Sequence, residues 1–383
     1  MSDADRMNLA YIEEVTFGTT PSTPAFKDLR FTSESIAQIT GTVNSAEIRS
    51  DRQIVDHIRT TINVAGDVNV ELSFSAFDDF LEAGLLSADF TAEISLTATD
   101  ISADNSDNSI NSVAAAFTHT INRWIKISGF LTNATNNGFA RIATATTSKL
   151  TLVGITLITE AAGDSVTVIQ GAEIKNGTEQ RFFTFQKEYT DITEFARYTG
   201  CEIDTFTFTV PSDNIVTGTF GILGKIETSA QTAIAGATSV AAPANEVMAG
   251  IEDITAILEA NVAFPSTEFS ITLGNNLRQR LQIGSLGPIS IGTGVVEVTG
   301  TLQAYFDSAA ILDKYLNFTD SSLAIQFADS TGKGYVIDLP RVNYDTGTRV
   351  AGGQNTDIIV DLSFSAFRNS TQNETIVIQR FLA

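Results

Sequence analysis

Residues Val68–Phe77 read VNVELSFSAF and residues Ile358–Phe367 read IIVDLSFSAF, so the last six letters of the two stretches are identical. Weaker versions of the pattern lie between them, NIVTGTFGIL at Asn214–Leu223 and VEVTGTLQAY at Val296–Tyr305. Alternating apolar and polar residues, with many β-branched and aromatic side chains, are typical of β-strands. A pattern that returns at long spacing outweighs any single motif, and here it predicts a duplicated β domain.

The four stretches align on a valine and, four positions later, on a large apolar residue. The valines are Val70, Val216, Val298 and Val360, and the large apolar residues are Phe74, Phe220, Leu302 and Phe364. Residues four apart in a strand point to the same side of the sheet. We therefore expect these eight side chains to form the core of the repeated strands.

The spacing of the repeats indicates an insertion in the first copy. Val70 and Val216 lie 146 positions apart, whereas Val298 and Val360 lie only 62 apart. The difference of 84 residues corresponds to a small domain.

A short amphipathic helix is expected after the first strand of each copy. Segments Asp78–Ser87 and Asp307–Asn317 both place apolar residues on one helical face. We expect the carboxylates of Asp78 and Asp307 to accept free backbone N–H groups at the helix starts. The insertion follows the first of these helices.

These observations predict a mainly β chain in four parts. Residues 1–87 and 173–227 form a discontinuous β-sandwich or barrel domain, and residues 251–383 form its second copy, each with a short flanking helix. Residues 88–172 form an inserted small β-barrel or immunoglobulin-like domain, because short strands such as WIKISGF and FARIATAT alternate with turns. Residues 228–250 are rich in Ala, Ser and Thr and are a predicted linker.

The charge excludes one class of function. The formal net charge is −22, from 45 acidic and 23 basic residues, and this excess argues against general binding to nucleic-acid phosphate. Two interpretations of the acidity remain open, a surface past which DNA slides by repulsion and a simple contribution to solubility. The sequence has no predicted membrane span or secretory signal, and a single cysteine, Cys201, allows no disulfide within the chain.

The sequence predicts no enzyme, cofactor or metal site. His57 and His119 lack the spacing of zinc ligands, and no nucleophile elbow precedes a helix. Asp100, Asp104 and Asp107 cluster among Asn and Ser residues, but the calcium-loop pattern of a central Gly and a terminal Glu is missing. A β-rich binding module, such as an adhesin with carbohydrate-binding loops, is the alternative to a self-assembling structural protein.

A charged segment at Val43–Thr60 is the candidate contact with another subunit. We expect a long exposed loop or hairpin between strands, since its charges follow no helical period. The residues concerned are Arg49, Asp51, Arg52, Asp56 and Arg59. A loop that is merely solvated is the alternative.

Three stretches resemble the major tail proteins, or tail tube proteins, of long-tailed, siphovirus-like bacteriophages. They are AYIEEVTFGTTPSTPAFKDLRFTSESI at residues 10–36, GDVNVELSFSAFDDFLEAGL at 66–85 and WIKISGFLTNATNNGFARI at 124–142. The resemblance implies tube domains of two packed antiparallel sheets with a flanking helix. Rings of six such domains close an inner β-barrel and stack into a hollow tail that delivers DNA to the host.

Most relatives are expected to contribute one tube domain per chain, and two domains here predict trimeric rings with pseudo-sixfold symmetry. Hexameric rings are the alternative if the second copy does not complete the barrel. The implied partners are further copies, stacked rings and other tail proteins (tape measure, terminator and distal tail), with DNA passing unbound and no membrane. The resemblance places the protein in the virion tail, and in the host cytoplasm during assembly. We expect the charged segment to contact the next ring, the linker to join neighbouring domains, the insert to point outwards and acidic residues to line the lumen.

Overall fold

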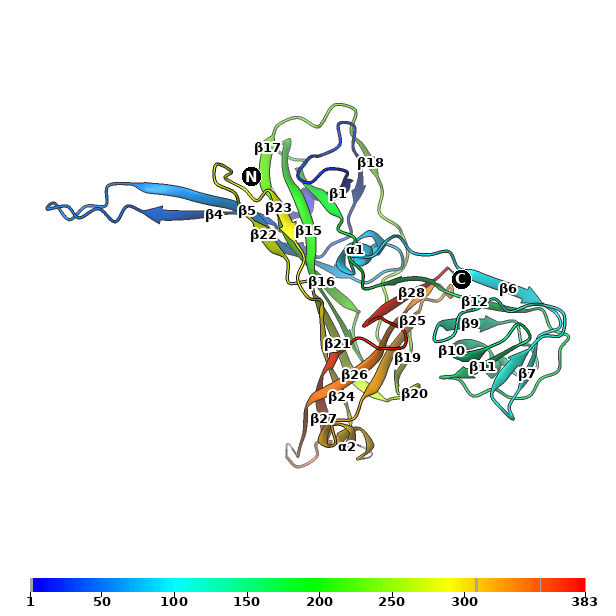
Figure 1. Ribbon diagram of the computed structural model, residues 1–383. Coiled ribbons are helices and arrows are strands. Elements are labelled where there is room, and N and C mark those ends of the chain that lie inside the picture. The colour runs from blue at the N-terminus through cyan, green and yellow to red at the C-terminus, as the bar shows by residue number, and fades with distance from the viewer. Residues whose placement is uncertain (1–2, 307–308, 352, 383) are drawn as a thin grey trace.

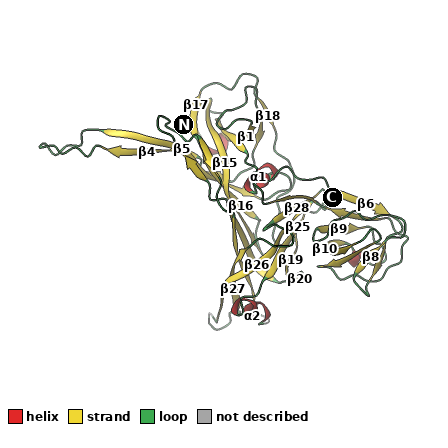
Figure 2. Cartoon of the chain, viewed as in Figure 1, coloured by secondary structure: helices red, strands yellow, loops and turns green. Residues whose placement is uncertain are grey.

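The computed structural model describes residues 3–306, 309–351 and 353–382. The protein is mainly β, with 52% of its residues in strands and 5% in helices, as Figure 2 shows. Three regions are visible in Figure 1: a central body, a long two-stranded arm, and a separate sheet on the other side of the body.

The body consists of two halves whose elements follow one another in the same order. The first half contains η1 (Ala4–Arg6), β1 (Met7–Glu14), β2 (Ala25–Asp28), β3 (Ser33–Glu34), β4 (Ala37–Asn44), β5 (His57–Glu71), α1 (Asp78–Gly84), β14 (Phe182–Tyr189), β15 (Glu194–Pro211), β16 (Thr217–Gly224) and β17 (Ile226–Ala230). The second half contains β19 (Ile254–Glu259), β20 (Val262–Ala263), β21 (Ser266–Gly274), β24 (Glu297–Tyr305), α2 (Ala310–Leu316), β25 (Ser321–Ala328), β26 (Gly334–Val350), β27 (Ile359–Ala366) and β28 (Val377–Phe381). A small hairpin of β22 (Arg278–Arg280) and β23 (Ser290–Gly292) lies between β21 and β24.

One continuous antiparallel sheet, the long sheet, runs through both halves in the order β4–β5–β16–β15–β21–β24–β27–β26. The first four strands and the last four have the same arrangement. The halves meet where β15 pairs with β21, with Thr207 opposite Thr272. We call this contact the internal junction.

A second layer covers one face of the long sheet, and a single long strand in each half belongs to both layers. In β15, residues 194–201 pair with β14, whereas residues 202–211 pair with β16 and β21. In β26, residues 334–342 pair with β25, whereas residues 342–350 pair with β27. Each half is therefore a two-layered β structure with a helix at its side.

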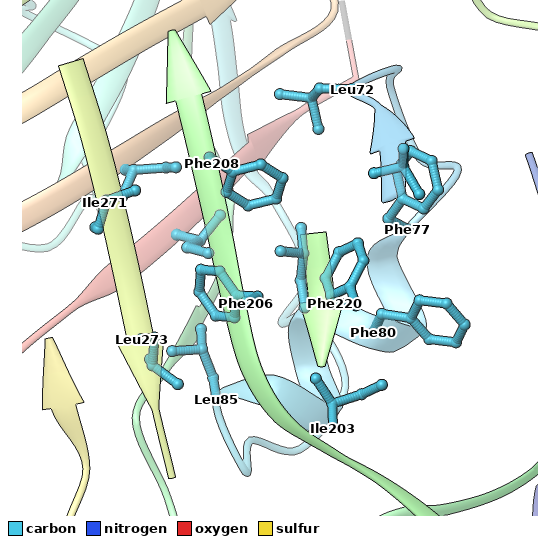
Figure 3. Packing of buried hydrophobic residues seen from close by; sticks show 14 of the residues in the cluster. Leu72, Phe77, Phe80, Leu85, Ile203, Phe206, Phe208, Phe220, Ile271 and Leu273 are labelled. Carbon is cyan, nitrogen blue, oxygen red and sulfur yellow. The ribbon is translucent and has the colours of Figure 1, made fainter. Parts of the chain in front are cut away.

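The core lies between the two layers because every second residue of the long sheet is apolar. Phe206 and Phe208 of β15 pack with Phe220 of β16 and with Phe77 and Phe80 around α1, and Figure 3 shows these rings together. All five side chains are buried. Burial of such large rings, each removing about 150–250 Å² from water, dominates the stability of a β layer.

The insert forms a separate seven-stranded sheet with its own core. Its order is β6 (Ile94–Ala98), β12 (Val166–Gln170), β9 (Trp124–Ser128), β10 (Gly138–Ala145), β11 (Lys149–Val153), β8 (Ser109–Asn111) and β7 (Ser102–Asp104), with η2 (Ala134–Asn136) in one connection. The chain returns through β13 (Ala172–Lys175), which pairs with β28. Trp124 and Phe139 of the insert share a small buried cluster with Phe381 and Leu258 of the second half, so the insert is fixed to the body.

The two identical stretches LSFSAF, at Leu72–Phe77 and Leu362–Phe367, adopt different structures. Leu362–Ala366 lies within β27, whereas β5 ends at Glu71 and the first hexapeptide forms a turn into α1. The structure therefore corrects the expectation of a strand that includes Phe74. The cause is tertiary: the Asn245 side-chain amide donates to the Phe74 carbonyl at 2.8 Å, and the Met248 N–H donates to the Leu72 carbonyl at 2.8 Å.

The alignment of the two first strands also needs a correction of four residues. Val70 lies opposite Gly218, and the residue at the same place in the second half is Leu302, opposite Leu362. Val298 was the expected equivalent. Equivalent residues are identified by which residues lie opposite each other in the long sheet. The sequence pattern alone does not show that pairing.

The start of α1 differs from the expectation as well. No side chain caps α1, whose N-cap residue is Phe77, and the Asp78 carboxylate instead accepts from the Tyr335 hydroxyl at 2.6 Å and pairs with Arg380. Asp307 lies outside the described residues. Here the carboxylate ties the helix to the second half of the chain.

The linker at residues 228–250 lies along the first half. Its strand β18 (Thr238–Val240) pairs in parallel with β2, and Met248 is buried between Leu72 and Val216. The segment forms no core of its own, but it closes one end of the first half.

Candidate functional site: the hydroxyl face and the open edges of the long sheet

The face of the long sheet that points away from the core is covered with hydroxyl groups. We call it the hydroxyl face. One row across the strands consists of Asn69, Thr219, Thr207, Thr272, Thr299 and Ser365, and the next row consists of Glu71, Thr217, Thr209, Ser270, Thr301, Ser363 and Thr346. The strand period of two places these residues on one side while their chain neighbours are apolar.

Neighbouring strands bond to one another through these side chains. The Thr207 and Thr272 hydroxyls lie 3.0 Å apart, and those of Ser270 and Thr301 lie 2.7 Å apart. The Thr219 hydroxyl donates to the Asn69 side-chain oxygen at 2.7 Å. Such cross-strand pairs stabilise a sheet and satisfy the polar groups within it.

The charges on the hydroxyl face are all negative. The carboxylates that share its alternation are Asp67, Glu71, Glu268, Glu297 and Asp361, and all but Glu71 are exposed. No Lys or Arg side chain points to the hydroxyl face from Ala65–Glu71 of β5 or from the paired parts of the other described strands. The face can repel a polyanion and offers it no cation to bind.

The eight predicted core residues lie behind the hydroxyl face. Val70, Phe74, Val216, Phe220, Val298, Leu302, Val360 and Phe364 are all buried and belong to one hydrophobic cluster. They give the face a rigid apolar backing, since a packed core holds the backbone of each strand in place.

The long sheet has an open edge at each end. Among the described residues, no strand pairs with the outer edge of β26 from Asp345 to Val350, nor with the outer edge of Phe31–Ile36 beside β5. An unpaired edge presents a row of backbone N–H and C=O groups that can pair with another chain. These two edges are the candidate assembly sites.

The predicted charged segment is the tip of the arm. Residues 38–64, which we call the arm, form a hairpin of β4 and β5 that projects from the body in Figure 1. Arg49, Asp51, Arg52, Asp56 and Arg59 are all exposed, and the structure brings only Arg49 and Asp51 together, at 2.8 Å. Ile48 at the tip is completely exposed.

The acidic residues considered for calcium hold loops instead. The Asp100 carboxylate accepts from the Ser112 hydroxyl and from the N–H groups of residues 113–115, and these bonds keep its pKa well below the usual range. Asp107 pairs with Lys149, and the Asp104 carboxylate accepts from the Ser106 N–H. Within the part of the chain that the structure describes, no group of three His, Cys, Asp or Glu side chains is placed to hold a metal.

The histidines and the cysteine have structural positions. His57 lies exposed on the arm, and its Nδ1 is 2.6 Å from the Asn44 side-chain oxygen. His119 is buried in the insert, and burial lowers its pKa. Cys201 is fully buried in β15, and burial raises the pKa of its thiol.

Sequence reasoning missed three buried charged groups. Arg123 of the insert bonds to Glu374 at 2.5 Å, and Lys187 bonds to Glu34 at 2.6 Å. Glu202 is buried and accepts from the Gln180 side-chain amide at 3.2 Å, and burial raises its pKa to about 7. No sequence signal marks them, because strand alternation does not reveal which charged residue finds a distant partner.

Comparison with known proteins places this architecture in one family. No curated protein matches the chain. Among the described helices, none is long and apolar enough to cross a membrane. The family model described as phage tail tube protein matches residues 4–366, which include the first half, the insert, the linker and the second half up to the end of β27. The chain therefore belongs to the phage tail tube protein family.

Proposed function

We propose that this chain assembles into closed rings, which stack into the hollow tube of a phage tail and deliver DNA to the host. The observation that carries the proposal is the long sheet, which repeats one four-strand unit twice and ends on an open edge at both sides. A repeat with complementary open edges can close into a ring when further copies continue it.

The number of chains in a ring follows from the duplication. Each chain supplies two four-strand units, and the resemblance implies six tube domains in a ring. Three chains then complete one ring with pseudo-sixfold symmetry. A ring of six chains is the alternative.

The hydroxyl face is the proposed wall of the lumen. Its five carboxylates per chain carry the sign of the DNA phosphates. Charges act over about 10 Å at 0.1 M salt, so several rings of carboxylates influence DNA in the channel. The hydroxyl groups already bond to one another across strands, which leaves few unsatisfied groups to hold the DNA.

The remaining parts have proposed places around the wall. Residues 1–87 with 173–227, and residues 251–383, are the two tube domains, and residues 228–250 join them. The insert at residues 88–172 points outwards, and the arm contacts the next ring. Other tail proteins meet the ends of the tube, and assembly takes place in the host cytoplasm before the protein becomes part of the virion.

Electron microscopy of the purified protein at high concentration, with light scattering, tests the proposal. We expect closed rings or hollow tubes with three chains in each ring and outer bumps from the insert. A ring of six chains would change the stoichiometry alone. A monodisperse monomer at every concentration would overturn the proposal and favour a β-rich binding module, for which a glycan screen is the next measurement.

A further inference from the structure

The internal junction is a template for the contact between two copies. There, residues 205–211 of β15 pair antiparallel with residues 268–274 of β21, with Thr207 opposite Thr272 and Thr209 opposite Ser270. The two strands come from different copies of the repeat. The chain also presents one unpaired edge of each kind, at Asp345–Val350 and at Phe31–Ile36.

The residue of β26 that corresponds to Thr207 is Thr346. Thr207 lies opposite Thr219 in β16, and Thr346 lies opposite Ser363 in β27. Thr219 and Ser363 hold the same place in the aligned repeats. Continuing along the strands, Thr348 corresponds to Thr209.

The residue that corresponds to Ser270 is Ser33 of β3. Ser270 lies opposite Thr301, and Ser33 lies opposite Asn69. Thr301 and Asn69 are equivalent, since they lie opposite Ser363 and Thr219 respectively. The side chains agree with this alignment, because the Asn69 amide donates to the Ser33 hydroxyl at 2.8 Å while Ser270 and Thr301 bond at 2.7 Å.

We propose that Asp345–Val350 of one copy pairs antiparallel with Phe31–Ile36 of a second copy, with Thr346 opposite Ser35 and Thr348 opposite Ser33. We call this contact the outer junction. It rests on the proposed function in that it requires the chain to assemble, and it adds the strands and their register. The hydroxyl face then continues from chain to chain without interruption.

The two edges have the exposure that such a contact needs. Thr346, Thr348 and Ser33 are exposed in the single chain. At one end of the paired segment Val350 is opposite Phe31, and Val350 is 67% exposed although it is apolar. Pairing would cover this side chain and satisfy the backbone groups of the two edges that have no partner, whereas the Ile36 N–H and carbonyl already bond to Glu34 and Lys187.

The outer junction differs from the internal junction on the side facing the core. In the internal junction the buried Phe208 and Ile271 are opposite each other. The corresponding pair in the outer junction is Gly347 and Glu34. The Glu34 carboxylate is held by Lys187, whose ammonium lies 5.0 Å from the centre of the Tyr198 ring.

This difference makes the two junctions chemically distinct. An apolar strand edge placed against Glu34 would desolvate a charged pair without a new partner, which is unfavourable. At Gly347 the β26 edge brings no side chain of its own against the Glu34–Lys187 pair, and the side chains of Tyr315 and Leu312 of α2 lie next to Gly347.

Disulfide cross-linking of the assembled full chain tests the register. Residues directly opposite each other have Cβ atoms about 4.5–5.5 Å apart, whereas diagonal neighbours are about 7–8 Å apart. A disulfide needs a Cβ separation of roughly 3.5–4.5 Å. The native Cys201 is fully buried, so the introduced thiols react without competition.

The test variant is Ser33→Cys with Thr348→Cys, and the shifted control is Ser35→Cys with Thr348→Cys. We expect the test variant to form covalent multimers upon mild oxidation of the assembled protein, and the shifted control to form far fewer. Equal or better cross-linking of the shifted control would overturn the register. Tubes that form in microscopy without a cross-link in this variant or in the second matched pair described below would overturn the outer junction and leave the proposed function standing.

Two further measurements keep the outcome decisive. The variant Ser35→Cys with Thr346→Cys tests the same register at a second position, and its cross-linking is expected if the first pair distorts the strand. The wild-type chain is imaged alongside. If neither the wild-type chain nor any variant assembles at any concentration, both the outer junction and the proposed function are wrong.

Discussion

The hydroxyls of Thr207 and Thr272 lie 3.0 Å apart, although the two residues belong to different copies of the repeat. Their bond is part of the internal junction, which the chain forms with itself. Joining two units in one chain turns an association between molecules into one within a molecule, so the loss of translational freedom is smaller. Half of the junctions of a ring would be present before assembly starts.

The centre of the first core is predicted to be intolerant of truncation. The Phe220 ring is fully buried and has its centre 5.4 Å from that of Phe80 and 6.0 Å from that of Phe208. Phe220→Ala removes these contacts and leaves a cavity, so we expect it to lower the free energy of unfolding by about 3–5 kcal/mol. Urea denaturation measures the change. Val113→Ala, at an almost fully exposed side chain, is the control and should change little.

Stability is predicted to fall as the pH rises from about 4.5 to about 7. Burial, with a smaller contribution from Asp204, raises the pKa of Glu202 from 4.5 to about 7. In this window the unfolded chain has released the Glu202 proton and the folded chain still holds it, so higher pH favours unfolding. Below the window both states are protonated, and the effect vanishes.

The variant Glu202→Gln isolates this effect because its amide does not titrate. Urea denaturation from pH 4 to pH 8 should give a flatter pH dependence for the variant than for the wild-type chain. Parallel pH profiles for the two proteins would show that Glu202 titrates normally. Burial also raises the pKa values of Asp204, Glu82 and Asp338, and these three groups contribute any slope of the same sign that remains.

The attachment of the insert is predicted to depend on a buried ion pair. Arg123 lies 2.5 Å from the fully buried Glu374 and 2.5 Å from Glu173. Arg123→Met removes the nearer of the two cations paired with Glu374, since Lys175 lies 3.7 Å away, and breaking a buried pair costs about 3–5 kcal/mol. The double variant Arg123→Met with Glu374→Met removes both charges and should recover most of the loss. Thermal unfolding compares the three proteins, and a double variant as unstable as the single one would contradict this account.

The tip of the arm is predicted to be needed for stacking and dispensable for ring closure. Asn44 and His57 form the last described pair of the hairpin, so residues 45–56 can be replaced by an Asn-Gly turn of two residues. We expect the shortened protein to form single rings in electron microscopy where the wild-type chain forms tubes. The variant Ile48→Ser with Ile54→Ser removes apolar side chains of the tip and keeps its charges. It therefore distinguishes an apolar contact between rings from a contact made by the charged residues. Normal tubes from the shortened protein would exclude the arm as the contact between rings.

The sign of the charge on the hydroxyl face is predicted to control the affinity of the tube for DNA. Thr217→Lys with Thr299→Lys adds two cations to this face, and Val113→Lys with Leu131→Lys adds two to exposed positions of the insert. We expect assembled tubes of the first variant to retain short duplex DNA, with retention falling as salt rises. The insert variant should retain much less at the same salt. Equal retention by both variants would show that the hydroxyl face is not the wall of the lumen.

Strand alternation predicted most of the fold, because the burial of every second residue can be recognised within a short stretch of sequence. Val216, Phe220, Val360 and Phe364 were placed in the core by that rule, and all four side chains are buried. The β class and the family followed from the same repeats and the stretches around them. Because the charged segment has no helical period, the expectation was a long exposed loop or a hairpin. The structure shows a hairpin.

The expectations that the structure corrects depended on residues far away in the chain. Leu72–Phe77 and Leu362–Phe367 have the same letters, yet the linker pairs with the first and strands of the long sheet pair with the second. Arg123 and Glu374 are 251 positions apart, so no local pattern links them. Asp78 had a local role available at a helix start, and Tyr335 and Arg380 of the second half bind it instead.

The pairing of β13 with β28 also constrains how the chain folds during synthesis. β28 comes after both of its partners in the chain, and it pairs with β13 and β26 on its two sides. A ribosome exposes the insert and most of the second half before it exposes β28. The insert can fold early around its own core and can meet Leu258 and Val336 before β28, but its docking is complete only when β28 and Phe381 arrive. A chain that lacks β28 would therefore have neither the β13–β28 pair nor a complete second layer, although the edges at Phe31–Ile36 and Asp345–Val350 would already have been synthesised.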